Sequence, residues 1–231
     1  MSVNMEFGHW VRCDTWAAAW QTSPADEVER CPLERQGGES GHATSLVRFR
    51  PGATFPRHAH PGGEELLILD GVFSDEHGDY PTGTYLRNPS GTSHAAFTRE
   101  GCTLFVKLCQ FAAGDHSEIR IDITTGAFTP VSPGVSKQAL YRFGDQHTHL
   151  TRFAPGATAE HHVHVGGEVV FVIEGTWQDD RGTYPAAPGC AFPTAATIPR
   201  TAPRARCCSS NAAICRRPSR RVDRAAGARY P

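Results

Sequence analysis

Three histidines and one glutamate in the first half of the chain have the residue types and the spacing of a metal site. His58 and His60 lie two residues apart in a segment that reads as extended, and side chains two apart in a strand point to the same side. Glu64 follows after a glycine turn, and His94 comes from a separate segment. Three imidazole nitrogens and one carboxylate oxygen suit Zn, Fe, Mn, Ni or Cu. The neighbouring Glu65 is an alternative ligand, and otherwise we expect it to orient a ligand or to face solvent.

The same pattern occurs again 104 residues further along the chain. PGATFPRHAHPGGEELLILDG begins at Pro51, and PGATAEHHVHVGGEVVFVIEG begins at Pro155. The second copy repeats the carboxylate of Glu64 but has Val169 in the position of Glu65, which favours Glu64 as the ligand. This self-similarity predicts two tandem copies of one unit. The second copy contributes three candidate metal ligands, which are His162, His164 and Glu168.

Both units read as β structure, which predicts an all-β fold. Short apolar runs such as LLIL (66–69) and VVFVI (169–173) are each followed by a turn glycine, Gly71 or Gly175. Many short strands at regular spacing favour a sandwich or a jelly-roll barrel. We expect five segments, which are 1–38 packing on the first barrel, a first unit at 39–112, a linker at 113–138, a truncated second unit at 139–187 and a tail at 188–231.

The tail differs from the rest of the chain in its charge, and it does not continue the repeat of 104 residues. Residues 1–187 hold 14 Lys or Arg and 23 Asp or Glu, whereas residues 188–231 hold 9 Arg and one Asp. The position that corresponds to His94 is 198, an Ile, so the second site lacks a fourth ligand. Read one frame over, with G or C at the wobble positions, residues 187–199 can give PGLRVPDGGDHT, which restores a histidine at 198. We therefore interpret 188–231 as a frameshifted, disordered tail rather than a nucleic-acid-binding arm.

Composition and cysteine usage narrow the class of protein. The acidic body argues against nucleic-acid binding. No apolar run reaches the ~18 residues of a membrane span and no signal-peptide pattern is evident, so we expect no membrane association. Four widely spaced cysteines outside the tail form no CxxC pair and read as reduced thiols of a cytoplasmic protein. They are Cys13, Cys31, Cys102 and Cys109.

The candidate ligands lie in segments that resemble the two motifs of the cupin family. The first motif is matched by Gly52, His58, His60, Glu64 and Gly71, and the second by Gly83, Pro89, Gly91 and His94, with Thr98 where asparagine is usual. More narrowly, VERCPLERQGGE, ATSLVRFRPG and HPGGEELLILDGVFSDEHGDYPTGTYLRNPSGTSH resemble the cupin-like domain of ChrR anti-sigma factors, over about residues 16–186. The resemblance implies a cupin jelly-roll barrel, present here as a tandem pair (a bicupin). It also implies zinc held by His58, His60, Glu64 and His94.

The resemblance frames two functional hypotheses. ChrR anti-sigma factors carry an N-terminal zinc domain with an H-x3-C-x2-C motif that binds the sigma factor, and no such motif precedes Cys13, so we expect no sigma-factor partner. The first hypothesis is a metal-binding sensor, regulatory or small-ligand-binding module, with Zn(II) as the metal. The second is an Fe(II)-dependent dioxygenase that cleaves diketones or hydroxyacetophenones, as related stand-alone cupins do. Whether the chain is an enzyme stays open, and a homo-oligomer is compatible with both hypotheses.

A few other side chains are minor candidates. His149 has the strand parity to face the interior of the second barrel, and His147 lies two residues before it. Arg87 and Tyr85 are expected at the rim of the first pocket. Three tryptophans are expected to pack at an edge, which are Trp10, Trp16 and Trp20.

Overall fold

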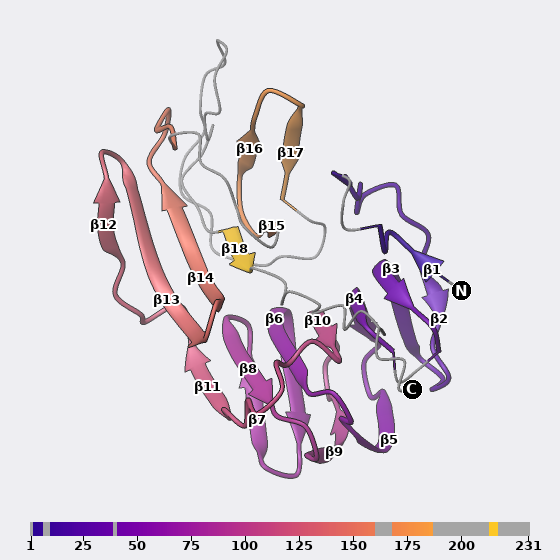
Figure 1. Ribbon diagram of the computed structural model, residues 1–231. Helices are drawn as coiled ribbons and strands as arrows, with labels where there is room; N and C mark the ends of the chain where they lie inside the picture. The colour runs from indigo at the N-terminus through magenta and orange to yellow at the C-terminus, as the bar shows by residue number, and fades with distance from the viewer. Residues whose placement is uncertain (1, 7–9, 39–40, 160–167, 187–212, 217–231) are drawn as a thin grey trace, which may run out of the picture.

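The computed structural model describes residues 2–6, 10–38, 41–159, 168–186 and, for the backbone, 213–216 (Figure 1). All regular secondary structure in these ranges is strand, which confirms the predicted all-β class. No helix in them is long and apolar enough to cross a membrane. The strands of the first half are β1 (Ser2–Val3), β2 (Gln21–Thr22), β3 (Val28–Gln36), β4 (Ala43–Phe49), β5 (Thr54–Ala59), β6 (Glu64–Asp75), β7 (Gly78–Pro81), β8 (Thr84–Asn88), β9 (Ser93–Phe97), β10 (Cys102–Leu108) and β11 (Ile119–Asp122). Those of the second half are β12 (Thr129–Ser132), β13 (Val135–Phe143), β14 (Gln146–Phe153), β15 (Val169–Val172), β16 (Thr176–Gln178), β17 (Thr183–Pro185) and β18 (Ala213–Arg216).

The first unit is a curled antiparallel sheet folded over a smaller layer. The large sheet has the order β1-β3-β4-β10-β6-β8-β11, with β2 beside β3. In the smaller layer β5 pairs with β9, while β6 pairs with β7 and touches β9, so β6 belongs to both layers. Figure 1 shows β5, β7 and β9 along the lower edge of this unit. The predicted jelly-roll arrangement is confirmed.

Strand β6 turns the corner between the two layers at Gly71. The sequence predicts that this strand ends at Gly71, but it continues to Asp75. Gly71 has a φ of 75°, in the left-handed region, and a Cβ on it would lie 2.1 Å from the carbonyl oxygen of Gly101. Glycine therefore marks a bend within the strand rather than its end, because both the backbone angle and the close neighbour exclude a side chain.

The apolar run of β6 is buried on both faces of the large sheet. Leu66 and Ile68 belong to the core inside the first barrel. Leu67 and Leu69 belong to a different core on the opposite face, which is shared with the second unit. Successive side chains of a strand alternate between faces, so a strand that is covered on both sides carries no polar residue in the run.

The shared core joins the two units. Phe105 of β10 packs against Phe171 of β15, with ring centroids 4.5 Å apart. Beside them the fully buried Arg87 lies between two rings, with its guanidinium carbon 4.0 Å from the centroid of Phe111 and 3.2 Å from that of Tyr141. The second unit thus covers the outer face of the first sheet and removes a large cationic side chain from water.

The second unit is a smaller sheet of order β12-β13-β14-β18-β15, with a separate hairpin of β16 and β17. Strand β18 pairs antiparallel with both β14 and β15. Its four residues come from the segment 188–231, for which the sequence predicts disorder. These four are ordered instead, because their backbone groups pair with the edges of two strands. The rest of that segment lies outside the described residues. The linker also contributes strands, since β11 extends the first sheet and β12 the second.

The N-terminal segment contacts both units. Strand β3 pairs with β4 of the first barrel. Trp10 packs against Tyr184 with centroids 5.9 Å apart, and Trp16 Nε1 donates a hydrogen bond of 2.9 Å to the carbonyl oxygen of Ala186. The segment therefore spans from the edge of the first sheet to the hairpin of the second unit.

Candidate metal centre

The four candidate ligands of the first unit converge at the junction of its two layers. His58 on β5 and His94 on β9 are direct partners in the antiparallel pairing of these strands. His60 follows β5, where its backbone N–H donates to the carbonyl oxygen of Thr92 at 2.9 Å, and Glu64 begins β6. One ligand atom from each of the four side chains lies within 4.8 Å of the others. The structure therefore brings together the residues that the sequence pattern selects in the first copy.

Each histidine has its Nδ1 atom engaged on the outer side of the cluster. An oxygen at Nδ1 fixes the orientation of the ring and leaves Nε2 as the nitrogen for a metal. The partner oxygens are Pro56 O, 3.0 Å from His58, Thr92 Oγ1, 3.0 Å from His60, and Asp75 Oδ2, 3.1 Å from His94.

The inner atoms of the cluster face one another without full hydrogen bonding. Glu64 Oε2 lies 3.4 Å from His60 Nε2 and 3.6 Å from His94 Nε2, and it accepts a hydrogen bond of 2.9 Å from Asn88 Nδ2. His60 Nε2 is buried and has no hydrogen-bond partner in the described structure. A buried polar atom of this kind is costly, and a cation between the four side chains would satisfy it. The donor set thus fits a divalent metal.

Burial and neighbouring charges act in different ways on the two buried histidines. Burial lowers the pKa of His60, and the nearby His94 and His58 lower it further against the opposing charge of Glu64. Burial also lowers the pKa of His94, but the hydrogen bond to Asp75 and the charge of Glu64 outweigh it, so the pKa of His94 is raised. Burial raises the pKa of Asp75, but its hydrogen bonds, first that with His94, outweigh burial and lower it. An ionised Asp75 therefore holds a proton on the outer nitrogen of His94.

A cavity of about 570 Å³ inside the first barrel has the four candidate ligands in its lining. Most of its other walls are apolar side chains of the interior core, such as Val47, Phe49, Leu104 and Val106. Small-molecule sites are typically concave, largely apolar and equipped with a few convergent polar groups. Through this cavity a small organic molecule can reach the four candidate ligands.

The residue after Glu64 belongs to the opposite face of the sheet. Glu65 pairs with Arg87 across β6 and β8, and Arg87 Nη2 lies 2.9 Å from Asp115 Oδ2 and its Nε lies 3.8 Å from Glu65 Oε2. Glu65 is 4% exposed and neither orients a metal ligand nor faces solvent. The expected place of Arg87 and Tyr85 at the pocket rim is wrong, because strand alternation directs both toward the second unit.

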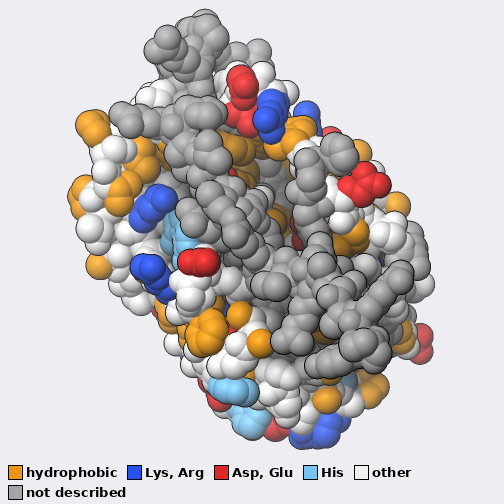
Figure 2. All heavy atoms as spheres, viewed as in Figure 1, with side chains coloured by type: hydrophobic (Ala, Val, Ile, Leu, Met, Phe, Trp, Pro, Cys, Tyr) orange, Lys and Arg blue, Asp and Glu red, His pale blue; other side chains and the backbone are white. Residues whose placement is uncertain are grey.

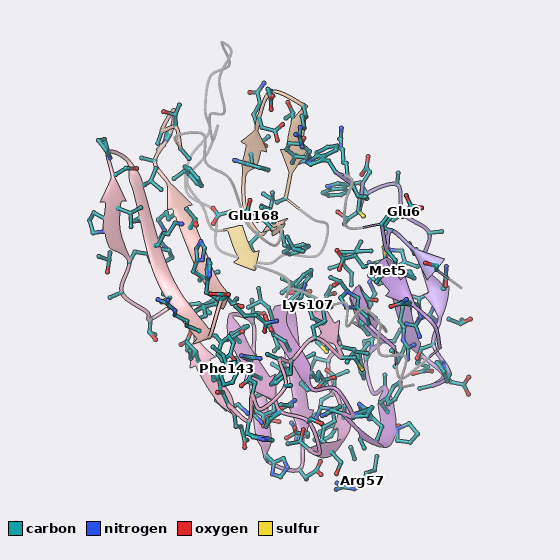
Figure 3. All side chains as sticks on the ribbon, viewed as in Figure 1. Met5, Glu6, Arg57, Lys107, Phe143 and Glu168 are labelled. Carbon is teal, nitrogen blue, oxygen red and sulfur yellow. The ribbon has the colours of Figure 1, made fainter. Side chains whose placement is uncertain are left out.

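The second candidate site is described only in part. His162 and His164 lie outside the described residues, as does position 198, so this site stays a prediction. Glu168 is exposed and directly precedes β15, as Figure 3 shows. His149 is buried on β14, and its ring stacks on that of His147 with centroids 5.4 Å apart.

Sequence reasoning misses three polar residues that orient the ligands, which are Asp75, Thr92 and Asn88. Thr92 lies two residues before His94, so strand parity could have indicated it. Asp75 carries no such signal, because its return to the site depends on β6 continuing past Gly71.

The sequence matches one protein family twice. Residues 9–112 and residues 116–204 each match the family described as the ChrR cupin-like domain. The chain belongs to the ChrR cupin-like family. The two matches coincide with the tandem repeat and confirm the predicted bicupin arrangement, and the second match extends past residue 187 into the tail. Among curated proteins, none matches the sequence of this ChrR-like cupin.

Solved structures share its fold at low sequence identity. A Nostoc punctiforme protein proposed to be a dioxygenase has a TM-score of 0.65 at 14% identity, over 93% of this chain and 84% of its own. A proposed glyoxylate-induced protein of Pseudomonas aeruginosa has a TM-score of 0.64 at 14% identity, over 90% and 86%. The bacterial pirin YhhW of Escherichia coli, in complex with nickel(II), has a TM-score of 0.62 at 13% identity, over 88% and 96%. These likenesses show the fold alone.

Proposed function

We propose that the first unit of this ChrR-like cupin binds one divalent metal ion and uses it to sense or bind a small molecule. The ligands are His58, His60, Glu64 and His94. The observation that carries the proposal is the convergence of their ligand atoms within 4.8 Å, with every outer imidazole nitrogen held by an oxygen. Zn(II) suits three nitrogens and one oxygen, and it agrees with the family resemblance.

The residues around the ligands set the geometry of the site. Asp75 and Thr92 fix the tautomers of their histidines, and Asn88 turns one oxygen of Glu64 toward the centre. A bound metal ion supplies a Lewis acid to which an oxygen of a small molecule can bind. The mostly apolar walls of the cavity lower the local dielectric constant beside the site and so strengthen such an interaction.

Metal analysis of purified protein tests this proposal. We expect His58→Ala and His94→Ala each to lose the metal of the first unit, whereas His77→Ala, an exposed histidine outside the cluster, keeps it. The measurement is inductively coupled plasma mass spectrometry in a background of His162→Ala with His164→Ala, which removes any contribution of the second copy. Full metal content in the His58→Ala protein contradicts the assignment.

A second candidate function is an Fe(II)-dependent dioxygenase. The observation in its favour is the organic-sized cavity that includes the candidate ligands in its wall. The similar fold of the Nostoc punctiforme protein proposed to be a dioxygenase agrees with it. Oxygen uptake with acetylacetone or hydroxyacetophenone by protein loaded anaerobically with Fe(II) separates the two functions. Uptake that depends on iron and on His58 favours the enzyme, and its absence favours the zinc-binding module.

The remaining proposals concern compartment and partners. The four cysteines whose side chains the structure describes are free thiols, which agrees with a reducing, cytoplasmic location. On the face in Figure 2, described side chains of Lys and Arg are interspersed with those of Asp and Glu. We propose a small molecule as the partner, because the four candidate ligands line a cavity of small-molecule size.

A further inference from the structure

We propose that the cavity of the first unit binds a molecule with an oxygen at each end, one facing the metal ligands and the other hydrogen-bonded to Ser45 on the wall formed by β4. A short hydrocarbon chain separates the two oxygens, so a hydroxy ketone is a molecule of this class. This inference rests on the proposed metal site for the orientation of the ligand. It adds Ser45 as the residue that selects the far end of the molecule.

Ser45 is a polar residue on an otherwise apolar strand face. Alternate residues of a strand share a face, and in β4 the face toward the cavity carries Ala43, Ser45, Val47 and Phe49. Val47 and Phe49 belong to the interior core of the first barrel. Among the described residues that line the cavity, Ser45 has the only hydroxyl group.

The hydroxyl of Ser45 is left over for a ligand. Ser45 is 4% exposed, and its hydroxyl makes no hydrogen bond to another residue in the described part of the chain. A buried hydroxyl without a partner is costly, and most such groups in folded proteins are paired. The arginines of the lining have partners within the chain, as in the bond of 3.0 Å from Arg35 Nη2 to the carbonyl oxygen of Gly38. An oxygen of a molecule in the cavity would satisfy Ser45.

The pairing of the strands places Ser45 within reach of a molecule at the metal ligands. Ser45 pairs with Val106 and Val106 with Leu66, so these three lie in one row across β4, β10 and β6. Glu64 lies two residues before Leu66 in β6, on the same face. Two strand spacings of ~4.8 Å and two residues of ~3.4 Å put the Cα atoms of Ser45 and Glu64 ~12 Å apart. Both side chains line the cavity, so a short chain connects them.

The surface between these two polar groups is apolar. Leu66 and Val106 are buried members of the interior core, and both line the cavity. Their side chains stabilise methylene groups and offer no partner to further polar groups. The ligand therefore has hydrocarbon between its two oxygens, and a sugar or a polyol fits this cavity less well.

The second copy of the repeat also has a hydrogen-bonding side chain at this position. The offset of 104 residues leads from Ser45 to His149, because HLTRF corresponds to SLVRF. His149 is buried on β14 and shares the strand face of Phe153, which belongs to a core within the second unit. A polar group at this inward position in both units agrees with a role in binding rather than in packing.

Calorimetry on the metal-loaded protein tests the inference. The probes are 6-hydroxyhexan-2-one, 7-hydroxyheptan-2-one and 8-hydroxyoctan-2-one, each compared with the unsubstituted alkan-2-one of the same chain length. We expect at least one hydroxy ketone to bind more tightly than its ketone, although its hydroxyl is better solvated in water. Ser45→Ala should weaken that hydroxy ketone about five- to tenfold, which is typical of a lost hydrogen bond, and leave ketone binding unchanged.

A matched control separates this inference from the proposed metal function. Ser132→Ala removes a hydroxyl from an exposed residue of β12 in the second unit, and it should leave the binding of both probes unchanged. Metal content and thermal midpoint are measured on every variant. Hydroxy ketone binding that is unaffected by Ser45→Ala, or that is no tighter than ketone binding in every pair, overturns the inference even if metal is bound. Binding that depends on Ser45 in protein without metal supports the Ser45 contact and refutes the metal function instead.

Discussion

Asp75→Asn is expected to weaken metal binding about 10- to 100-fold without unfolding the protein, which corresponds to about 1.4–2.7 kcal/mol. The reason is the direction of one hydrogen bond. Asp75 Oδ1 accepts from the backbone N–H of His77 at 2.8 Å and from the Tyr80 hydroxyl at 3.1 Å. These two donors keep the oxygen of an asparagine amide on their side, so its NH2 group faces His94 Nδ1. The Nδ1 atom must then accept, and the proton moves to Nε2, where it blocks the metal.

Competition with a chromogenic chelator measures the zinc affinity of Asp75→Asn. Asp79→Asn on the adjacent strand is the matched control, since its side chain is 56% exposed and bonds to Ser74 and Arg99 instead of the site. A pH titration of the metal-free protein by NMR adds a second readout. Asp75 raises the pKa of His94 above the ordinary 6.5, so the substitution should shift that titration to lower pH. Equal zinc affinities of Asp75→Asn and Asp79→Asn would refute the reasoning.

Other consequences of the structure are equally direct. Arg87→Met removes the cation that lies 2.9 Å from the buried carboxylate of Asp115 and should cost about 3–5 kcal/mol of unfolding free energy in urea titrations; a loss under 1 kcal/mol contradicts this. Burial raises the pKa of Cys102 to about 12, so a thiol reagent should label the exposed Cys13 first, and fast labelling of Cys102 in the folded protein disagrees with its burial. Resequencing of the gene should reveal a shifted frame before codon 198, whereas an intact frame shared by homologues with the same tail refutes the frameshift.

Where β6 pairs with β8, the two faces of the large sheet contact different parts of the molecule. The paired residues Glu64 and Asn88 face the metal cluster, and the next pair, Glu65 and Arg87, faces the second unit. These pairs are consecutive rungs of the same two strands, so the backbone of β6 and β8 carries both the contact with the second unit and the candidate ligand Glu64.

The all-β class, the tandem units and the first four candidate ligands follow from the sequence alone. Residue type, strand parity and a repeat at constant offset are local properties, and they already select His58, His60, Glu64 and His94. The same local reasoning is misleading where a strand is irregular. It ends β6 at Gly71, although the strand bends there and continues to Asp75.

Only the tertiary structure decides what surrounds those ligands. Asp75 reaches His94 because β6 bends and continues into the smaller layer. Arg87 turns away from the pocket because the second unit covers the outer face of the sheet, and which face of a strand is covered depends on segments far away in the sequence. Spacing along a strand determines which side chains lie together, but bends, bulges and the packing of distant strands determine what they meet.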